Sequence, residues 1–252
     1  MSGGSKNREI LYGMHPVLEA LRAGRRQIME VCIDAGSRGT RFSPVVEEAR
    51  RRRVPVRELT DRQLLAEVRA PNHQGVIARV GPYPYAPEPR SYRLVDHAPI
   101  WLLLDGVVDP RNLGAMLRTA LCAGAVGVVI AKDRAAPATP AVSRASAGAL
   151  EHVQLVRVTN MHRTIEAMKS DGLWIAGLDA DGDRPLYAAD LSGPLGLVVG
   201  GEGRGLRPLV RRSCDFLLRI PQSGPVDSLN ASIAAAVALY EAVRQRAPAA
   251  RK

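Results

Sequence analysis

The stretch IWLLLDGVVDPRNLGAMLRTALCAGAVGVVIA, residues 100–131, decides the fold class of this chain. It opens with IWLLLD, an uninterrupted apolar run typical of a strand buried on both faces of a parallel sheet. Residues 112–124 then carry apolar side chains at helical spacing, and VGVVIA at 126–131 predicts a second strand. A strand, a helix and another strand in close succession indicate an α/β fold with a parallel sheet covered by helices.

The same alternation continues to residue 246. We expect further helices at 139–150, 161–170 and 229–246, and further strands at 153–158, 173–179, 195–200 and 216–221. The pattern alone predicts a Rossmann-like, doubly wound domain. It does not predict a knot, because knotted chains are rare exceptions to the topology rules.

A proline-rich segment divides the chain. Five prolines within residues 81–99 disfavour a helix there and predict a semi-extended linker or a surface strap. Before it, helices are expected at 13–24, 43–53 and 61–69, and strands at 28–34, 54–59 and 75–80. We therefore expect a small α/β domain at 1–80, a linker at 81–96 and a larger domain at 97–252.

Composition narrows the class of protein. With 252 residues, 46% of them hydrophobic and 24% charged, the chain has the profile of a globular protein with a substantial core. It has no apolar run long enough for a membrane span, and its start, MSGGSKNREI, has no apolar signal-peptide core. The three cysteines are far apart and show no metal-ligand spacing. We expect a cytoplasmic protein without disulfides, metal or membrane contact.

The net charge of +10 indicates a polyanionic partner, with nucleic acid the usual candidate. Residues 1–80 hold 15 basic and 9 acidic side chains, which is +6 of the total. Aromatic residues make up only 4%, so binding by base stacking is not expected to dominate. Phosphate contacts would carry more of the affinity.

Two clusters in the first domain are candidate RNA contacts. The first could be either a phosphate-binding patch or a solvated helix end that complements the helix dipole. The second could read RNA edges or could be a plain turn. The residues of the two clusters are Arg50, Arg51, Arg52 and Arg53, and Asn72, His73 and Gln74.

Three segments of the second domain follow predicted strands, where ligands gather in open α/β sheets. The first, DGVVDPRNLGAMLRTA, places Asn112 at a helix start and Arg118 in an otherwise small and apolar helix. The second, LGLVVGGEGRGL, has four glycines between Gly200 and Gly205, which allow a close backbone approach. It is neither a dinucleotide fingerprint nor a P-loop, and Glu202 would repel a phosphate. The third, RIPQSGPVDSLNASIAAAV, carries Ser228 and Asn230 at the start of an alanine-rich helix.

Each segment alone has an ordinary structural explanation. An exposed Arg118, a tight glycine turn and a helix cap by Ser228 or Asn230 would need no ligand. Together, N-x-G-x-x-x-R, G-G-E-G-x-G and I-P…S-L-N-x-S resemble the three motifs of the SpoU (TrmH) family of RNA 2′-O-ribose methyltransferases, in the same order. YGMHPVLEAL, NHQGVIARV and VSRASAGALEHVQLVRVTN resemble the ribosomal branch of that family.

The resemblance implies S-adenosyl-L-methionine as cofactor and a homodimer. It also implies a SPOUT domain with a C-terminal trefoil knot and a small first domain similar to ribosomal protein L30e. The implied activity is methylation of a guanosine ribose in the peptidyl-transferase region of 23S rRNA. The implied catalytic residues are Arg118, Asn112, Glu202, Ser228 and Asn230, and the implied cofactor-binding residues are Gly200, Ile220, Leu229, Gly201 and Gly203.

The expected chemistry accounts for these residue types. A ribose 2′-hydroxyl becomes a good nucleophile only as its developing negative charge is stabilised, and methyl transfer from a sulfonium needs in-line placement. Arg118 has been given two roles in such enzymes, general base or electrostatic stabiliser. A side-chain pKa above about 12 favours stabilisation of the alkoxide and contact with the adjacent phosphate.

Two other functions remain open from the sequence. The same chemistry could act on a tRNA or on another rRNA nucleotide. Alternatively, the chain could be a non-catalytic RNA-binding or ribosome assembly factor that kept the fold, although a pure binder needs none of Arg118, Glu202 and Asn230. The appended first domain favours a ribosomal target by analogy only.

Overall fold

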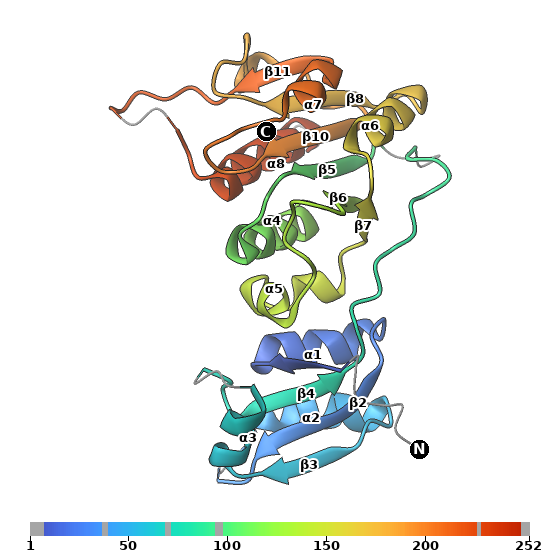
Figure 1. The fold of residues 1–252 in the computed structure, drawn as a ribbon, viewed down its shortest axis with the longest axis vertical. Coiled ribbons are helices and arrows are strands. Elements are labelled where there is room, and N and C mark those ends of the chain that lie inside the picture. Colours follow the sequence, from blue (N-terminus) through green and yellow to red (C-terminus); the bar gives the residue numbers. More distant parts are fainter. Residues whose placement is uncertain (1–7, 37–39, 69–71, 94–97, 226–227, 248–252) are drawn as a thin grey trace, which may run out of the picture. The chain divides into compact units, whose positions relative to one another are not determined.

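A computed structural model describes residues 8–36, 40–68, 72–93, 98–225 and 228–247 (Figure 1). The described residues form two compact units. One comprises residues up to Pro84 together with Pro137–His152, and the other comprises Tyr85–Ala136 and the chain from Val153. Each unit has its own sheet and its own hydrophobic core.

The first unit is built on a four-stranded mixed sheet in the order β1-β4-β2-β3. Strands β2 and β3 are parallel, and β4 pairs antiparallel with both β1 and β2. Helices α1 and α2 cover one face of the sheet, and α3 packs against the other through Leu64. The bounds are β1 Glu9–Tyr12, α1 Met14–Ala23, β2 Ile28–Asp34, α2 Ser43–Arg51, β3 Val56–Leu59, α3 Asp61–Val68 and β4 Val76–Val80.

Residues 137–152 differ from their prediction in two ways. The single helix expected at 139–150 is wrong: α5 covers only Pro140–Ala145, and a 3-10 turn follows at Ala149–Glu151. Ala147 and Gly148 break the helix because both have positive φ, at 51° and 85°. The segment also groups with the first unit, whereas the sequence placed it within the domain at 97–252.

The second unit contains a seven-stranded sheet whose strands pair parallel throughout, in the order β7-β6-β5-β10-β8-β11-β9. The parallel-sheet prediction is therefore confirmed. The strand bounds are β5 Ile100–Asp105, β6 Gly127–Ala131, β7 Leu155–Val158, β8 Trp174–Leu178, β9 Arg184–Pro185, β10 Leu195–Gly200 and β11 Phe216–Arg219. All residues of β5 and β10 are buried, as expected for central strands covered on both faces.

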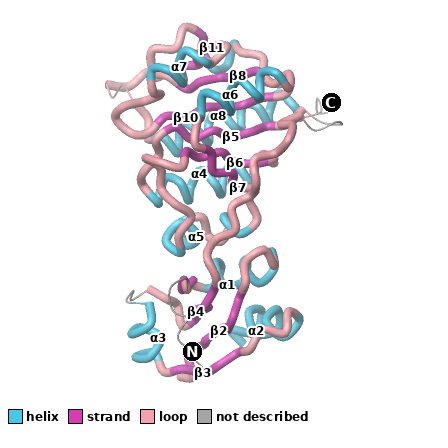
Figure 2. Tube along the Cα trace, turned by 45° about the vertical axis from the view of Figure 1, so that its right-hand side comes forward, coloured by secondary structure: helices cyan, strands magenta, loops and turns pink. Residues whose placement is uncertain are grey.

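Four α-helices of the second unit pack on this sheet, with α4 against α8 and α6 against α7 (Figures 1 and 2). Their bounds are α4 Pro110–Cys122, α6 Met161–Ser170, α7 Pro208–Ser213 and α8 Ala231–Arg246. The sequence did not predict α7, β9 or, in the first unit, β1, because each is too short to show a clear period. Within the described ranges, no helix combines the length and the apolar character that crossing a bilayer requires.

Much of the proline-rich segment is a strap packed on the second unit. The backbone N–H of Ala86 donates to Leu155 O (2.9 Å) beside β7. Tyr92 is 2% exposed and contacts Trp101 edge to face, with ring centroids 5.2 Å apart. The indole of Trp101 donates to Tyr92 O (3.1 Å). Of the two predicted alternatives, linker or strap, the described part to residue 93 follows the second, and residues 94–96 lie outside the described ranges.

Candidate functional site

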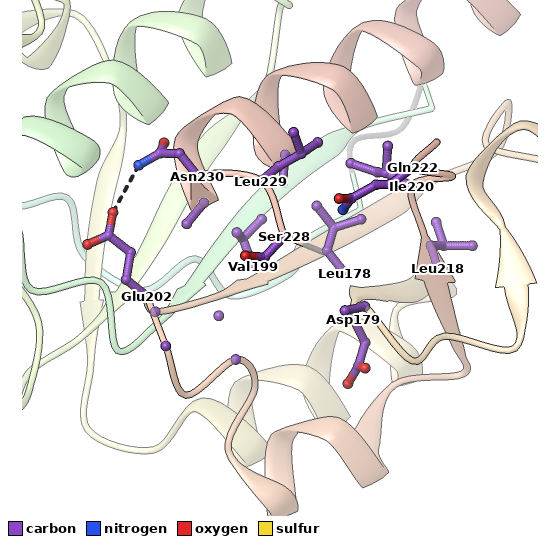
Figure 3. Close-up of a pocket in the computed structure, with 17 residues that line it drawn as sticks. Leu178, Asp179, Val199, Glu202, Leu218, Ile220, Gln222, Ser228, Leu229 and Asn230 are labelled. Atoms are coloured by element: carbon purple, nitrogen blue, oxygen red, sulfur yellow. Dashed lines mark hydrogen bonds between the residues drawn. The ribbon is translucent and has the colours of Figure 1, made fainter. Parts of the chain in front are cut away.

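A cavity of about 550 Å³ opens beyond the carboxyl ends of β8, β10 and β11 (Figure 3). The register places Gly200 beside Asp105, Val199 beside Leu178, and Leu178 beside Leu218, so these strand ends meet at one edge. The size suits a small-molecule ligand. The lining residues are Leu178, Asp179, Ala180, Val199, Gly200, Gly201, Glu202, Gly203, Gly205, Leu218, Ile220, Gln222, Ser228, Leu229, Asn230, Ala231 and Ala234.

Two glycines let the backbone approach this cavity closely. A Cβ on Gly200 would lie 2.2 Å from the carbonyl carbon of Gly205, and a Cβ on Gly201 would lie 2.2 Å from Gly106 O. Both contacts are with backbone atoms, which cannot rotate away. Glycine is therefore required where the residues after β10 fold back on themselves and pack against the residues after β5.

Three polar side chains from the three sequence motifs meet at one side of the cavity. The Asn112 amide donates to Glu202 Oε1. The Asn230 amide donates to the same Glu202 oxygen (2.9 Å) and to Asn112 Oδ1 (3.1 Å), as Figure 3 shows in part. Asn112 is 9% exposed, so its hydrogen bonds are made away from bulk water. Residues up to 118 positions apart thus form one hydrogen-bonded cluster.

Local structure fixes each member of this cluster. Asn230 is the N-cap of α8, where its Oδ1 accepts from the backbone N–H of Ser232 (2.9 Å) and Ile233 (3.4 Å). Its amide nitrogen is thereby turned toward Glu202. The cap of α4 is Asp109, not Asn112. The Arg111 side chain and the capped N–H hold the pKa of Asp109 below its ordinary value.

Arg118 lies apart from this cluster. It is exposed on α4, and it does not line the cavity. Six helical residues beyond Asn112 correspond to a displacement of about 9 Å along the axis. Within the part of the chain that the structure describes, no ion pair holds its guanidinium, which is therefore available to an external anion.

Ser228 and the expected cofactor-binding residues all lie at the cavity. Ser228 and Leu229 precede the cap of α8, and Ile220 directly follows β11. Sequence reasoning missed Asp179 and Gln222, which also line it. Asp179 is the last residue of the strand predicted at 173–179, so the rule that ligands gather beyond carboxyl strand ends could have identified it.

The four arginines of the first RNA candidate divide into two pairs. Arg51 and Arg52 form ion pairs with Glu48, and Arg52 also donates to Arg22 O (2.5 Å). Arg51, ahead of the other causes, lowers the pKa of Glu48. Arg50 and Arg53 are exposed, and within the described residues neither side chain has an ion-pair partner. Half of the cluster is therefore available to a phosphate.

In the second candidate, two of three side chains make internal contacts. His73 is 4% exposed, and its Nδ1 accepts from the Gly75 N–H (3.1 Å). Gln74 has φ 59°, and its Oε1 accepts from the Met14 N–H (3.0 Å) at the start of α1. Asn72 is exposed. This geometry favours the turn for His73 and Gln74 and leaves Asn72 accessible.

Comparisons with known proteins identify the family. The model of the SpoU rRNA methylase family matches residues 99–240, and a model described as RNA 2′-O ribose methyltransferase substrate binding matches residues 10–86. The chain belongs to the SpoU rRNA methylase family. The resemblance seen in the motifs is thus confirmed.

One relative and two solved structures illustrate the likeness. The 23S rRNA (guanosine-2′-O-)-methyltransferase RlmB of Pseudomonas putida is 41% identical over 241 residues, covering 94% of this chain and 97% of its own. The AdoMet-bound rRNA methyltransferase from Sinorhizobium meliloti has a TM-score of 0.80 at 27% identity, covering 96% and 89%. The SpoU methyltransferase AviRb from Streptomyces viridochromogenes, in complex with the cofactor AdoMet, has a TM-score of 0.79 at 28% identity, covering 97% and 94%.

The cofactor of this family member is S-adenosyl-L-methionine, and the cavity fits it. Leu178, Val199, Leu218, Ile220 and Leu229 supply apolar walls for an adenine ring. Gly200, Gly201 and Gly203 also line the cavity, so main-chain atoms form part of its wall. The described residues contain no group of three or more His, Cys, Asp or Glu side chains placed to hold a metal ion.

Proposed function

We propose that this protein transfers a methyl group from S-adenosyl-L-methionine to the 2′-hydroxyl of a guanosine ribose in 23S rRNA, in the peptidyl-transferase region. The convergence of Asn112, Glu202 and Asn230 beside a cofactor-sized cavity carries the proposal. It is supported by relatives named 23S rRNA (guanosine-2′-O-)-methyltransferase that match nearly the whole chain.

The cofactor supplies an electrophilic methyl group on a positively charged sulfur. In the proposal, backbone at Gly200, Gly201, Gly203, Ile220 and Leu229 holds its adenosyl part, all of it at the cavity. Methyl transfer depends mainly on placement, and these residues would supply it by fixing the cofactor at the cavity.

The motif side chains act on the ribose. The Asn112–Glu202–Asn230 cluster, with Ser228, orients the nucleotide beside the cofactor. Arg118 stabilises the negative charge that develops on the 2′-oxygen and contacts the neighbouring phosphate. Its exposed guanidinium, with no ion pair among the described residues, is consistent with binding an external anion.

The first unit is proposed to bind rRNA as an L30e-like module. Its mixed four-stranded sheet flanked by helices is compatible with that fold, and Arg50, Arg53 and Asn72 are its accessible candidates. Arg51, Arg52, His73 and Gln74 would support these contacts through the internal ion pairs and hydrogen bonds that they make. In the second unit, α8 follows β11 and packs back against α4, beside the tightly folded loop after β10. We propose that this part of the second unit forms the trefoil knot that the family resemblance implies.

A homodimer in the cytoplasm completes the proposal. Ile233 and Tyr240, seven residues apart on α8, are 53% and 50% exposed and form an apolar stripe suited to a second copy. The described structure leaves all three cysteines free, as is usual in a reducing compartment. Light scattering on the purified protein would measure the oligomeric state, and a Tyr240→Glu variant should shift it toward the monomer.

Methyl transfer to undermodified 23S rRNA tests the function. With cofactor labelled in the methyl group, we expect label on one guanosine ribose and a backbone bond there that resists alkaline cleavage. Label on a base would contradict methylation of the ribose. Label on tRNA but not on 23S rRNA, in parallel reactions, would contradict the proposed substrate. Cofactor binding measured by calorimetry separates an enzyme from a pure RNA binder, which should release no heat.

A further inference from the structure

Asp105, the first residue of the segment DGVVDPRNLGAMLRTA, is a buried carboxylate at the carboxyl end of β5 to which the sequence assigned no role. It is 1% exposed. Its Oδ2 accepts from the backbone N–H of Arg207 (2.9 Å), and its Oδ1 accepts from Arg207 Nε (2.6 Å), with Nη2 at 2.5 Å. One carboxylate therefore holds both the main chain and the guanidinium of a residue 102 positions away.

The backbone of Asp105 holds the other end of the same loop. Residues 201–206, here named the glycine loop, connect β10 to the residue that precedes α7. The Gly201 N–H donates to Asp105 O (2.9 Å), and within the loop the Gly205 N–H donates to Gly201 O (3.1 Å). Both ends of the glycine loop are thus attached to Asp105, one through its carbonyl and one through its carboxylate.

Glu202 occupies the second position of this loop. Its carboxylate must reach two amides that come from α4 and from the start of α8. Hydrogen bonds tolerate little change in the donor–acceptor distance. A shift of the loop by about an ångström would therefore break the two that Glu202 accepts. The same shift would move Gly201, Gly203 and Gly205, which line the cofactor cavity.

A buried carboxylate is a costly way to hold a loop. The Asp105 carboxylate is removed from water, whereas the Arg207 side chain stays 44% exposed, and well-packed apolar residues often stabilise a fold as well or better. The Asp105–Arg207 pair therefore contributes geometry more than stability. A carboxylate that accepts a backbone N–H and a guanidinium N–H sets the position of Arg207, because these hydrogen bonds are directional and an apolar contact is not.

We propose that Asp105 is a positioning residue for the methyl transfer, acting through Arg207 to hold the glycine loop so that Glu202 and the cofactor cavity keep their geometry. Neither Asp105 nor Arg207 lines the cavity, so the pair acts on the reaction only through the loop. This inference rests on the proposed function for its kinetic part alone, since cofactor binding can be measured without any RNA.

Asp215 provides a control with similar bonding at the opposite end of the same sheet, where its side chain is 17% exposed and that of Asp105 is fully buried. Asp215 Oδ2 accepts from the backbone N–H of Ile175 (2.8 Å), and its Oδ1 pairs with Lys169 Nζ (2.8 Å). It joins a backbone N–H and a cation as Asp105 does, but at the amino ends of β8 and β11. An Asp215 variant therefore measures how far the loss of such a pair, away from the cavity, lowers the melting temperature, the cofactor affinity and kcat.

The test compares Asp105→Asn with Asp215→Asn in the full-length protein. Melting temperature, cofactor dissociation constant by calorimetry, and kcat and KM on undermodified 23S rRNA are measured for each. For Asp105→Asn we expect cofactor affinity to fall at least tenfold and kcat at least a hundredfold, with KM for RNA within about threefold. For Asp215→Asn we expect a smaller loss of melting temperature, because its side chain is more exposed, with near wild-type affinity and kcat.

Arg207 variants keep the test decisive if Asp105→Asn does not fold. The Arg207 side chain is 44% exposed, so its replacement leaves no large cavity. Arg207→Ala should reproduce the loss of affinity, and Arg207→Lys should restore part of it. Wild-type affinity in Arg207→Ala, or equal losses in the Asp105 and Asp215 variants, would overturn the proposal. Normal cofactor binding by wild-type protein without transfer to 23S rRNA would instead refute the proposed function, and the affinity comparison would still stand.

Discussion

At the scale of single residues, Glu202 is the side chain on which two others depend. Its Oε1 accepts from Asn112 and from Asn230, and Asn112 is buried. Replacement by alanine leaves a buried amide without its acceptor, whereas glutamine keeps an oxygen at the same place. A missing partner for a buried polar group costs about 1–3 kcal/mol.

We therefore expect Glu202→Ala to lower the free energy of unfolding by about 1–3 kcal/mol, and Glu202→Gln to lower it by less than half as much. Urea unfolding of the two variants and the wild type measures both values. Both substitutions should still reduce methyl transfer, since each removes the charge at the cavity. Equal stability of the alanine variant and the wild type would mean that the amide finds another acceptor.

Glu241 provides a prediction about pH. Its carboxylate accepts from Arg244 Nε and Nη2 and from Gln245 Nε2, all at 2.8 Å. These contacts, Arg244 first, lower its pKa from 4.5 to about 2. A carboxylate with a lowered pKa stabilises the fold above its unfolded-state pKa, and this contribution is lost as pH falls through the folded-state pKa.

Glu241→Gln should therefore lower the melting temperature by a constant amount from pH 7 down to about 4.5. The difference between variant and wild type should then shrink as the pH approaches 2. Calorimetric scans at four or five pH values across this range measure it. A difference that stays unchanged down to pH 2 would show that Glu241 acts through packing and not through its charge.

At the scale of structural elements, the turn after β10 depends on a glycine. A Cβ at Gly201 would lie 2.2 Å from Gly106 O, so the turn or the residues after β5 would have to move. The whole element would shift, because the Gly201 N–H is also bonded to Asp105 O (2.9 Å).

We expect Gly201→Ala to lower the free energy of unfolding by about 1–3 kcal/mol, as overpacking typically does. Its affinity for S-adenosyl-L-methionine should fall at least tenfold. Gly193→Ala is the matched control, because a Cβ there meets no atom within 4 Å and its φ is not in the left-handed region. Thermal unfolding measures the stability of both variants, and calorimetry measures their cofactor affinity. Equal losses in Gly201→Ala and Gly193→Ala would show that the contact with Gly106 is unimportant.

At the scale of the whole molecule, the charge of +10 sets how RNA binding responds to salt. Each phosphate contact releases counterions, which changes the slope of log affinity against log salt concentration by about 0.7–0.9. Only cations without an internal partner contribute fully. Among the residues that the structure describes, Arg50 and Arg53 meet this condition, whereas Arg51 is ion-paired with Glu48.

The double variant Arg50→Ser/Arg53→Ser should therefore bind a 23S rRNA fragment more weakly, with a salt slope reduced by about 1.5. Arg51→Ser is the control and should change the slope by less than 0.5, a bound of about half of one contact. Filter binding between 50 and 300 mM salt, roughly the range over which such slopes are measured, provides the data. An unchanged slope in the double variant would remove this cluster from the RNA-binding surface.

The sequence by itself determined the elements with a clear local period and the three motifs of the second domain. The strand at 100–105 and the helix at 161–170 have the bounds expected, because apolar spacing reports burial directly. The motif residues Glu202, Ser228 and Asn230 lie at the cavity as expected. The sequence did not predict short elements such as β1 and β9, because an element of two to four residues is too short to show a period.

Only the tertiary structure decided which distant residues act together. The bond from Asn230 to Asn112 spans 118 positions, and that from Arg207 to Asp105 spans 102. The structure also placed residues 137–152 with the first unit and turned His73 and Gln74 toward internal partners. Periodicity records whether a side chain is buried, but a buried polar group takes the partner that the packed chain brings to it, and that partner can lie anywhere in the sequence.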